Sequence, residues 1–308
     1  MKLSVSLITF QEEAYIAQAL DSVLAQETDF DFEIVVGDDA STDGTRDILN
    51  AYRHRYPDKV KLLLPESNYG DFGLSNVRAT LDNCRGQYIA LLDGDDYWTE
   101  KTKLQQQVDF LDGNPECSFS AHRIVHSSND GHTELSELPA SSAAEKPADS
   151  AAEKQVSNTG KSNVSSNWNI YTIESLIRLN FAHKISTVAR SDAVRAVPEW
   201  FYTSNLASAD WVFNLLLAQQ GHIGFIDSPM AIHRKRGGSV SDVHGQERLL
   251  RDRLRTLNIL GAEFPQYQSA IKHARLRTNI RLAIVNLSPG IYHWAQRAYC
   301  YRRSGYKS

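Results

Sequence analysis

The chain contains the stretch Tyr88-Ile89-Ala90-Leu91-Leu92-Asp93-Gly94-Asp95-Asp96, an apolar run that ends in three carboxylates. An unbroken apolar run of this length is typical of a strand buried on both faces of a parallel sheet. Gly94 permits a sharp turn, which lets the neighbouring carboxylates converge. Crowded carboxylates repel one another and lose hydration, so a positive group normally compensates them. The alternative interpretation is a turn rich in Asp and Gly, with Asp96 as the cap of the next helix.

A second acidic turn of the same design lies upstream. The apolar run 32–36 ends in Gly37-Asp38-Asp39-Ala40-Ser41-Thr42-Asp43-Gly44. Strands that stop at acidic loops suit an open α/β sheet, in which ligands bind at the carboxyl ends of the strands. Asp39 can accept hydrogen bonds from the base or ribose of a nucleotide, and its alternative role is turn chemistry or helix capping. For Asp43 we prefer this alternative role of turn chemistry or helix capping.

Strands and helices alternate through residues 1–125. We expect strands at 3–8, 32–36, 60–64 and 88–92, and helices at 16–25, 46–56, 74–84 and 104–111. This alternation predicts a parallel sheet with helices on both faces. After the first strand comes Thr9-Phe10-Gln11-Glu12-Glu13, in which Phe10 can stack on a base or simply pack.

Four segments together carry a resemblance to a known family. They are residues 9–13, 20–26, 32–45 and 86–98, and their order and spacing are similar to the opening of family 2 glycosyltransferases. The family implies a GT-A fold, a nucleotide-sugar donor, a divalent cation and inversion at the anomeric carbon. It often has Pro-Thr-Tyr-Asn where this chain has Ile8-Thr9-Phe10-Gln11, so the stacking surface is kept without the tyrosine hydroxyl.

The resemblance also implies roles for individual residues. Asp95, with Asp96 as its neighbour, is expected to hold the cation. Carboxylate oxygens suit Mn²⁺ or Mg²⁺, which typically bind one or two carboxylates plus the phosphates of a nucleotide. The nucleotide pocket is expected to be lined by Thr9, Phe10, Glu12, Asp39, Asp93 and Gly94.

The second half of the chain supplies a further acid. Residues 209–218 read as an apolar helix headed by Asp210, whose carboxylate faces the positive end of the helix dipole. An acidic residue before Trp at the start of such a helix is the catalytic base in the resembled family, and Asp210-Trp211 matches that pattern. A capping Asp fits the helix physics equally well.

The segment 230–241 resembles the closing strand and glycine-containing loop of the family. Arg234 and Arg236 suit a diphosphate as bidentate donors. Relatives often have a metal-binding His at the place of Arg236, and arginine has no lone pair for this role. His233 is therefore the candidate histidine ligand, and its alternative role is that of a buried structural histidine.

We divide the chain into four parts. Residues 1–126 form the nucleotide-sugar-binding half, and 127–169 are a low-complexity insertion that composition predicts to be disordered. Residues 170–244 form the acceptor-binding and catalytic half of the same domain, and 245–308 a basic amphipathic helical tail. The three cysteines form no C-x-x-C pair, which favours a reducing cytosol.

Charge is distributed unevenly, with +9 in residues 245–308 and −13 in residues 1–244. A basic amphipathic tail can lie on an anionic membrane surface, which would place the protein at the inner face of the plasma membrane. It can equally pack as an appendage on the acidic catalytic part. A nucleic-acid partner fits poorly, because the catalytic part is acidic and no recognition motif is present.

The resemblance favours an inverting transferase that moves a sugar from a nucleoside-diphosphate carrier to a hydroxyl acceptor. We favour a UDP-sugar as donor, a hexosyl or N-acetylhexosaminyl group as cargo, and a cell-envelope carbohydrate or lipid-linked glycan as acceptor. One alternative is a nucleotidyltransferase, although Gln11-Glu12-Glu13 would repel a triphosphate. The other alternative is a non-catalytic protein that binds sugar nucleotides.

Overall fold

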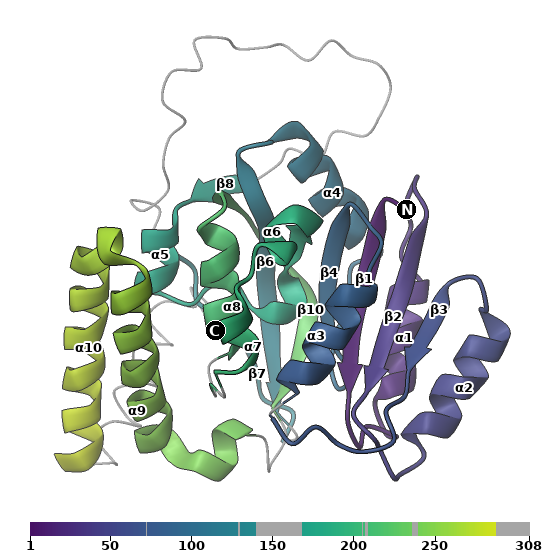
Figure 1. Cartoon of the computed structure of the whole chain (residues 1–308), viewed down its shortest axis with the longest axis horizontal. Coiled ribbons are helices and arrows are strands. Elements are labelled where there is room, and N and C mark those ends of the chain that lie inside the picture. The colour runs from purple at the N-terminus through teal and green to yellow at the C-terminus, as the bar shows by residue number, and fades with distance from the viewer. Residues whose placement is uncertain are drawn as a thin grey trace.

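The computed structural model describes residues 1–71, 73–128, 130–139, 168–204, 206, 209–235 and 240–287. Within these residues ten strands form one sheet (Figure 1). Eight strands follow the order β3-β2-β1-β4-β9-β6-β10-β5, while β7 pairs with β6 and β8 with β10.

The first half of the sheet is parallel, as the sequence predicts. Its strands are β1 (Leu3–Thr9), β2 (Phe32–Asp38), β3 (Val60–Leu63) and β4 (Tyr88–Asp93). β1 lies between β2 and β4, and its end pairs Thr9 with Asp38 and Ile8 with Asp93. The two acidic turns therefore flank the end of β1 on either side.

The second half of the sheet is mixed, which differs from the mostly parallel arrangement that we expected. β9 (Val188–Arg190) is antiparallel to both β4 and β6 (Cys117–Ser128). A 3₁₀ turn, η2 (Lys184–Ser186), lies just before β9 in the sequence. β9 therefore starts near the carboxyl end of β4 and runs antiparallel to it, so no crossover helix is needed between the two strands. This reversal brings Lys184 to the acidic turn.

The remaining strands extend the mixed half. β10 (His222–Lys235) is parallel to β6 and antiparallel to β5 (Tyr97–Trp98) and β8 (Trp168–Tyr171). β7 (Thr133–Leu135) pairs antiparallel with β6. The β5–β10 pairing joins the segment after the acidic turn to the strand that carries His233 and Arg234.

Helices cover both faces of the sheet, and alternate residues of each strand point to opposite sides. One hydrophobic cluster includes Leu3, Val5 and Leu7 and is covered by α1 (Ile16–Leu24), α2 (Thr45–Arg55) and α4 (Lys103–Gly113). The other includes Ile89 and Leu91. It is covered by α3 (Leu74–Asn83), α5 (Ile173–Arg178), α6 (Ser191–Arg195), α7 (Glu199–Tyr202) and α8 (Ala209–Ala218).

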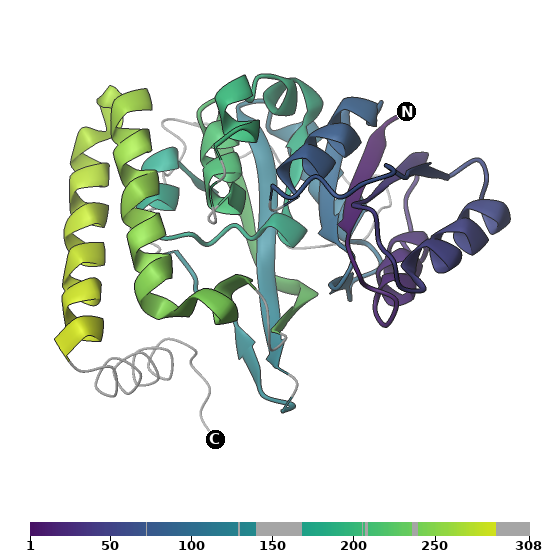
Figure 2. The same cartoon turned by 60° about the horizontal axis from the view of Figure 1, so that its bottom comes forward.

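The tail is helical, as expected, over its described part. α9 (Val240–Glu263), the turn η3 (Pro265–Tyr267) and α10 (Gln268–Leu287) form a hairpin at one edge of the molecule (Figures 1 and 2). Among the described helices, none combines the length and the apolar character that crossing a bilayer requires. Residues 140–167 of the expected insertion, residues 288–308 of the tail, and Arg236 lie outside the described residues.

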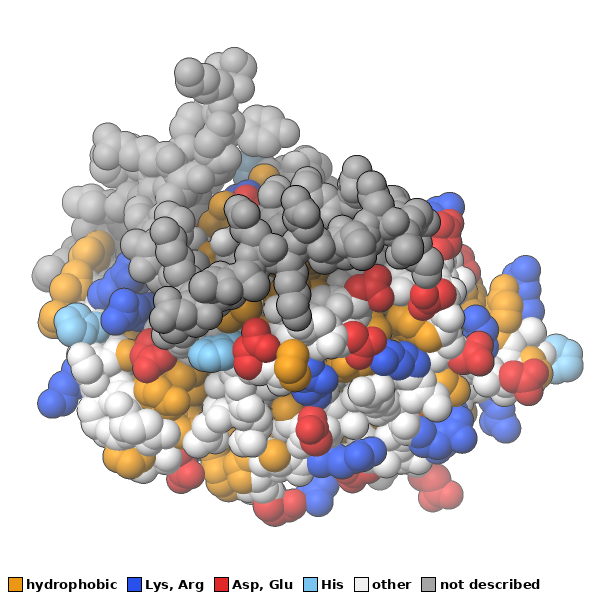
Figure 3. Space-filling view, turned by 90° about the horizontal axis from the view of Figure 1, so that it is seen from above, with side chains coloured by type: hydrophobic (Ala, Val, Ile, Leu, Met, Phe, Trp, Pro, Cys, Tyr) orange, Lys and Arg blue, Asp and Glu red, His pale blue; other side chains and the backbone are white. Residues whose placement is uncertain are grey.

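The upper face of Figure 1 carries charges of both signs. Seen from above, acidic and basic side chains are interspersed over its described part (Figure 3). Mixed charge of this kind creates no extended field of one sign that would attract a polyanion. The functional side chains gather at the opposite edge, where the parallel strands end.

Candidate active site

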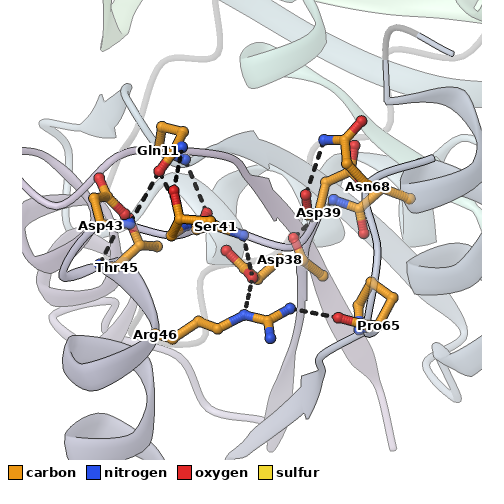
Figure 4. Close-up of polar contacts among 12 residues, drawn as sticks. Gln11, Asp38, Asp39, Ser41, Asp43, Thr45, Arg46, Pro65 and Asn68 are labelled. Carbon is orange, nitrogen blue, oxygen red and sulfur yellow. Dashed lines mark hydrogen bonds and ion pairs between the residues drawn. The ribbon is translucent and has the colours of Figure 1, made fainter. Parts of the chain in front are cut away.

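The loops after β1 and β2 are tied together by side-chain hydrogen bonds (Figure 4). Gln11 donates its backbone N–H to Ser41 Oγ at 2.8 Å, and its Oε1 accepts from the backbone N–H groups of Thr42 and Asp43 at 3.1 Å each. Asp43 in turn accepts from the backbone N–H groups of Thr45 and Glu13. Asp43 therefore serves the turn, which is one of the two structural roles that we preferred for it, whereas the N-cap residue of α2 is Gly44.

Asp38 anchors the loop after β2. Its Oδ2 accepts from Arg46 Nε at 2.6 Å and from the backbone N–H of Ser41 at 3.0 Å. Arg46 also donates to the carbonyl of Pro65, so the loop after β3 joins the same network (Figure 4). These contacts hold the loops after β1, β2 and β3 together, and we call the three linked loops the rim.

Two residues of this rim adopt a backbone conformation that L-residues rarely use. Gln11 has φ of 56° and Ala40 has φ of 59°, immediately beyond the ends of β1 and β2. Each such residue costs about 1–3 kcal/mol and persists only where surrounding contacts over-determine it, typically at functional sites. The hydrogen bonds of Gln11 supply such contacts.

Asp39 lies under the loop after β3. It is 5% exposed, and its Oδ1 accepts from the backbone N–H of Tyr69 at 2.9 Å. Burial raises the pKa of Asp39, the Tyr69 N–H opposes this, and the charges of Asp71 and Asp38 add to the rise. Phe10 and Tyr69 are 46% and 45% exposed beside this carboxyl group. Two flat aromatic faces and an acceptor thus occur on adjacent loops, and the sequence did not single out Tyr69.

Thr9, Glu12 and Gly94 form the floor where β1 meets the acidic turn. Thr9 is 5% exposed and Glu12 8% exposed. A Cβ atom on Gly94 would lie 2.6 Å from Thr9 Oγ1, so only glycine allows this approach. Gly94 also donates its N–H to the carbonyl of Ile8 at 2.8 Å. The turn is therefore fixed directly against the end of β1.

The three acids of the turn have different surroundings. Asp93 Oδ1 lies 2.5 Å from Lys184 Nζ. Asp96 is 1% exposed, and its Oδ1 accepts from the backbone N–H of Arg234 at 2.8 Å. Burial and the charges of Asp95 and Asp93 raise the pKa of Asp96 well above its usual range. Asp96 thus anchors β10, which leaves Asp93 and Asp95 as the acids of the site.

Arg234 lies beside Asp95 and clamps the turn. Its guanidinium group donates to the Asp95 carbonyl and to Gln18 Oε1. The same group lies 4.5 Å from the centre of the Tyr97 ring and 5.0 Å from that of Tyr15. The structure brings Arg234 to the acidic turn, and its role toward a diphosphate stays a prediction.

Asp210 and the acidic turn meet around Lys184. Burial lowers the pKa of Lys184, but Asp93, Asp210 and Asp95 outweigh this effect and raise it. Asp210 is open to solvent on one side and surrounded by protein on the others. Burial therefore raises its pKa, Lys184 opposes the rise, and Asp93 adds to it. One ammonium group thus links carboxylates from two separate parts of the chain.

Lys184 and Asp210 also share a pocket. Its empty volume is about 430 Å³, which includes solvent space at the open mouth. Apolar side chains also line the pocket, among them Ile8, Leu91, Phe201 and Phe213. The sequence did not identify Lys184, because no periodicity marks a lysine in a short turn and only the reversed course of β9 brings it here.

His233 belongs to a histidine cluster. Its Nδ1 lies 3.1 Å from Nδ1 of His126, whose ring meets that of His183 edge-on at 5.0 Å. Burial and nearby positive groups lower the pKa of His126 to about 2 and that of His183 to about 3. No group of three or more His, Cys, Asp or Glu among the described residues is arranged to hold a metal. A ligand role for His233 stays a prediction.

Comparison with known proteins assigns the chain to a family. The family described as "Glycosyl transferase family 2" matches residues 4–178, which is more than half of the chain. The protein belongs to this family.

Relatives agree with the assignment. The chain is 30% identical over 240 residues to an uncharacterised protein of Mycobacterium tuberculosis, which covers 77% of this chain and 60% of the relative. It is 37% identical over 118 residues to the putative teichuronic acid biosynthesis glycosyltransferase TuaG of Bacillus subtilis, covering 38% of this chain and 44% of TuaG. The chain thus spans 60% of the length of the mycobacterial relative.

Solved structures share the fold. Staphylococcus aureus TarS 1–349 in complex with UDP-GlcNAc matches with a TM-score of 0.61 and 18% identity, covering 94% of this chain and 76% of TarS 1–349. The mannosyltransferase PcManGT of Pyrobaculum calidifontis, in complex with GDP-Man and Mn²⁺, matches with a TM-score of 0.56 and 15% identity, covering 97% and 79%. The expected GT-A type of fold is confirmed.

Proposed function

We propose that the protein is an inverting glycosyltransferase with a nucleoside-diphosphate sugar as donor and a hydroxyl group as acceptor. The observation that carries the proposal is that Asp93, Asp95 and Asp210 all interact with the ammonium group of Lys184, which lines one pocket together with Asp210. A UDP-sugar is the favoured donor, and a hexosyl or N-acetylhexosaminyl residue the favoured cargo. The name of TuaG supports an acceptor in the cell envelope, either a carbohydrate or a lipid-linked glycan.

Asp210 is the catalytic base of this proposal. It takes the proton of the acceptor hydroxyl while that oxygen forms a bond to the anomeric carbon. The bond from this carbon to the diphosphate oxygen breaks on the opposite face, which inverts the configuration in a single displacement. A positioned general base typically contributes about 10²–10⁴-fold to the rate.

Lys184 is a positioning residue in the proposal. Its charge opposes the rise in the pKa of Asp210, and so favours the carboxylate form that a base requires. Its contact with Asp93 also holds that side chain of the acidic turn in place. The apolar walls around Asp210 exclude part of the solvent, which strengthens both effects.

Asp95, with Asp93 beside it, suits a Mn²⁺ or Mg²⁺ ion. Carboxylates are hard oxygen ligands, and fewer than three protein ligands converge in the described residues. Such a site fits an ion that takes its other ligands from donor phosphates and water, as Mg²⁺ does with nucleotides. When bound, the ion neutralises negative charge on the departing diphosphate. Arg234 beside the turn suits the same diphosphate, and so does Arg236, which is proposed from sequence alone.

The nucleoside is proposed to bind on the rim of loops after β1, β2 and β3. Phe10 and Tyr69 offer exposed rings for stacking on a base. Asp39 offers a carboxyl oxygen that already accepts from the backbone N–H of Tyr69, and Thr9 and Glu12 are buried in the loops of the same rim. The rigid network of Gln11, Ser41 and Asp38 keeps this surface in place before the ligand arrives.

Two measurements test the proposal. A thermal-shift panel of nucleoside diphosphates and sugar nucleotides, with and without Mn²⁺, identifies the donor, because a bound ligand raises the melting temperature by mass action. With that donor, Asp210→Asn is expected to lower turnover about 10²–10⁴-fold while donor affinity stays within twofold. Asp58→Asn removes an exposed acid elsewhere and serves as the control.

The outcomes separate the possible functions. Wild-type turnover by Asp210→Asn would exclude Asp210 as the base. Donor binding by the unmodified protein without hydrolysis or transfer would favour the non-catalytic binding protein. Release of pyrophosphate from a nucleoside triphosphate would favour the nucleotidyltransferase.

A further inference from the structure

Helix α10 carries a stripe of exposed apolar side chains. Leu276, Ile280 and Ile284 are 60%, 51% and 36% exposed. Their spacing of four residues puts them along one side of the helix, over about 12 Å of its length. Only three other large apolar side chains of the described residues are comparably exposed, and they lie in other regions: Met1, Phe10 and Tyr69.

The stripe is not needed to hold α10 in place. The opposite side of the helix is buried through Ala270, Ile271, Ala274 and Thr278, and the core cluster that contains its apolar members also includes α5 and α9. α10 is the outermost helix at its edge of the molecule in two views (Figures 1 and 2). The solvent-facing side of a surface helix normally carries polar residues, so the apolar stripe indicates that this side binds a partner.

The residues around the stripe are positively charged. α10 contains Lys272, Arg275, Arg277 and Arg281 and no acidic residue, and the last acid of the whole sequence is Glu263. Lys272, Arg277 and Arg281 are exposed. Arg275 differs from these three residues, because its guanidinium group donates a hydrogen bond to Asn258 on α9. An apolar stripe bordered by cations for which the described residues supply no acidic partner fits an anionic surface with an apolar interior.

The charges extend toward α9. Burial, together with the positive charges of Arg281 and Arg277, lowers the pKa of Arg253 to about 10. The nearby Glu137 opposes this effect only in part. Positive potential is therefore concentrated along the side of the hairpin that borders the stripe.

We propose that the outward face of α10 docks on an anionic lipid surface. Leu276, Ile280 and Ile284 enter the boundary between headgroups and acyl chains, while Arg277, Arg281 and Lys272 lie at lipid phosphates. A second copy of the chain fits this face less well, because a two-fold contact would set Arg277 and Arg281 near their own counterparts. The proposal concerns an interaction surface and does not depend on the identity of donor or acceptor.

Flotation of the full-length protein with vesicles tests the proposal. The vesicles contain phosphatidylcholine alone or with phosphatidylglycerol. We expect binding only to the anionic vesicles, and weaker binding at high salt. The triple variant L276Q/I280Q/I284Q should bind more than tenfold more weakly. R277Q/R281Q should lose about fivefold for each removed charge.

A matched control separates this face from general charge effects. R53Q/R55Q removes two exposed arginines from α2, at the opposite end of the molecule (Figure 1), and should bind as the wild type does. Thermal melting, monitored by circular dichroism, checks that the variants fold. If L276Q/I280Q/I284Q does not fold, the vesicle binding of R277Q/R281Q tests the proposal.

Three results would overturn the proposal. The first is equal binding by the wild type and both α10 variants. The second is equal binding to vesicles with and without phosphatidylglycerol. The third is a stable dimer in solution that L276Q/I280Q/I284Q abolishes while vesicle binding is unchanged, since the stripe would then be a contact between copies.

Discussion

Replacing Lys184 by methionine removes the ammonium group that the acids of the site share while keeping a side chain of similar length. Lys184 Nζ lies 2.5 Å from Asp93 Oδ1, and the two side chains are 11% and 27% exposed. Asp95 and Asp210 also interact with the ammonium group. Lys184→Met therefore leaves Asp93, Asp95 and Asp210 without this shared cation.

The cost can be estimated from the contact with Asp93. Hydrogen bonds to charged groups contribute about 1.5–3 kcal/mol, and exposed ion pairs about 0–1 kcal/mol. Because this pair is mostly but not fully buried, we expect the free energy of unfolding to fall by about 1–2 kcal/mol. The pKa of Asp210 should rise, since its burial and the charge of Asp93 then act without opposition. A protonated Asp210 cannot act as a base, so turnover should fall more at low pH than at high pH.

The assay is the pH profile of kcat for wild type, Lys184→Met, Lys184→Arg and Lys101→Met. We expect the acidic limb to move to higher pH in Lys184→Met and to return toward the wild type in Lys184→Arg. Lys101 forms an exposed pair with Glu27, with 3.8 Å between Nζ and Oε1, so its removal should leave the limb unchanged. An acidic limb in Lys184→Met that coincides with that of the wild type would refute the electrostatic role of Lys184.

Three further predictions concern single side chains. Lys103 is fully buried with no hydrogen-bond partner for Nζ within the described residues and only the Trp98 ring 4.0 Å away, so Lys103→Met should stabilise the protein by about 1–2 kcal/mol in thermal melts. Burial lowers the pKa of Lys103 in the fold, so the gain should be full below this lowered pKa and shrink as the pH rises toward the ordinary lysine pKa; a loss of stability would mean that Nζ has a partner. Gly94→Ala should destabilise by about 1–3 kcal/mol, because its Cβ would lie 2.6 Å from Thr9 Oγ1, and an unchanged melting temperature would contradict this packing. Phe10→Ala should weaken nucleotide affinity by about 1–3 kcal/mol in calorimetry if the ring stacks on the base, and unchanged affinity would show that it does not.

Local pattern predicted the first half of the fold. The apolar runs before Asp38 and Asp93 became β2 and β4, because a run without polar residues can be satisfied only in the middle of a sheet. The sequence also predicted α8, whose bounds of Ala209–Ala218 coincide with those of the expected helix. In these places propensity, burial and turn chemistry agree.

Pattern did not reveal the long-range part of the site. The direction of β9 depends on where the preceding chain emerges, so neither the antiparallel pairing nor the place of Lys184 can be derived from residues 184–190 alone. The stacking of Arg234 between Tyr15 and Tyr97 likewise depends on the pairing of β10 with β5. A motif indicates which acids gather at the strand ends, whereas their electrostatic partners depend on tertiary contacts.

The configuration of the product tests the account most directly. With an α-linked sugar nucleotide identified by the thermal-shift panel, nuclear magnetic resonance of the first-formed product reports the new anomeric linkage. A single displacement with Asp210 as base and no protein nucleophile predicts a β-linked product. An α-linked product would contradict it.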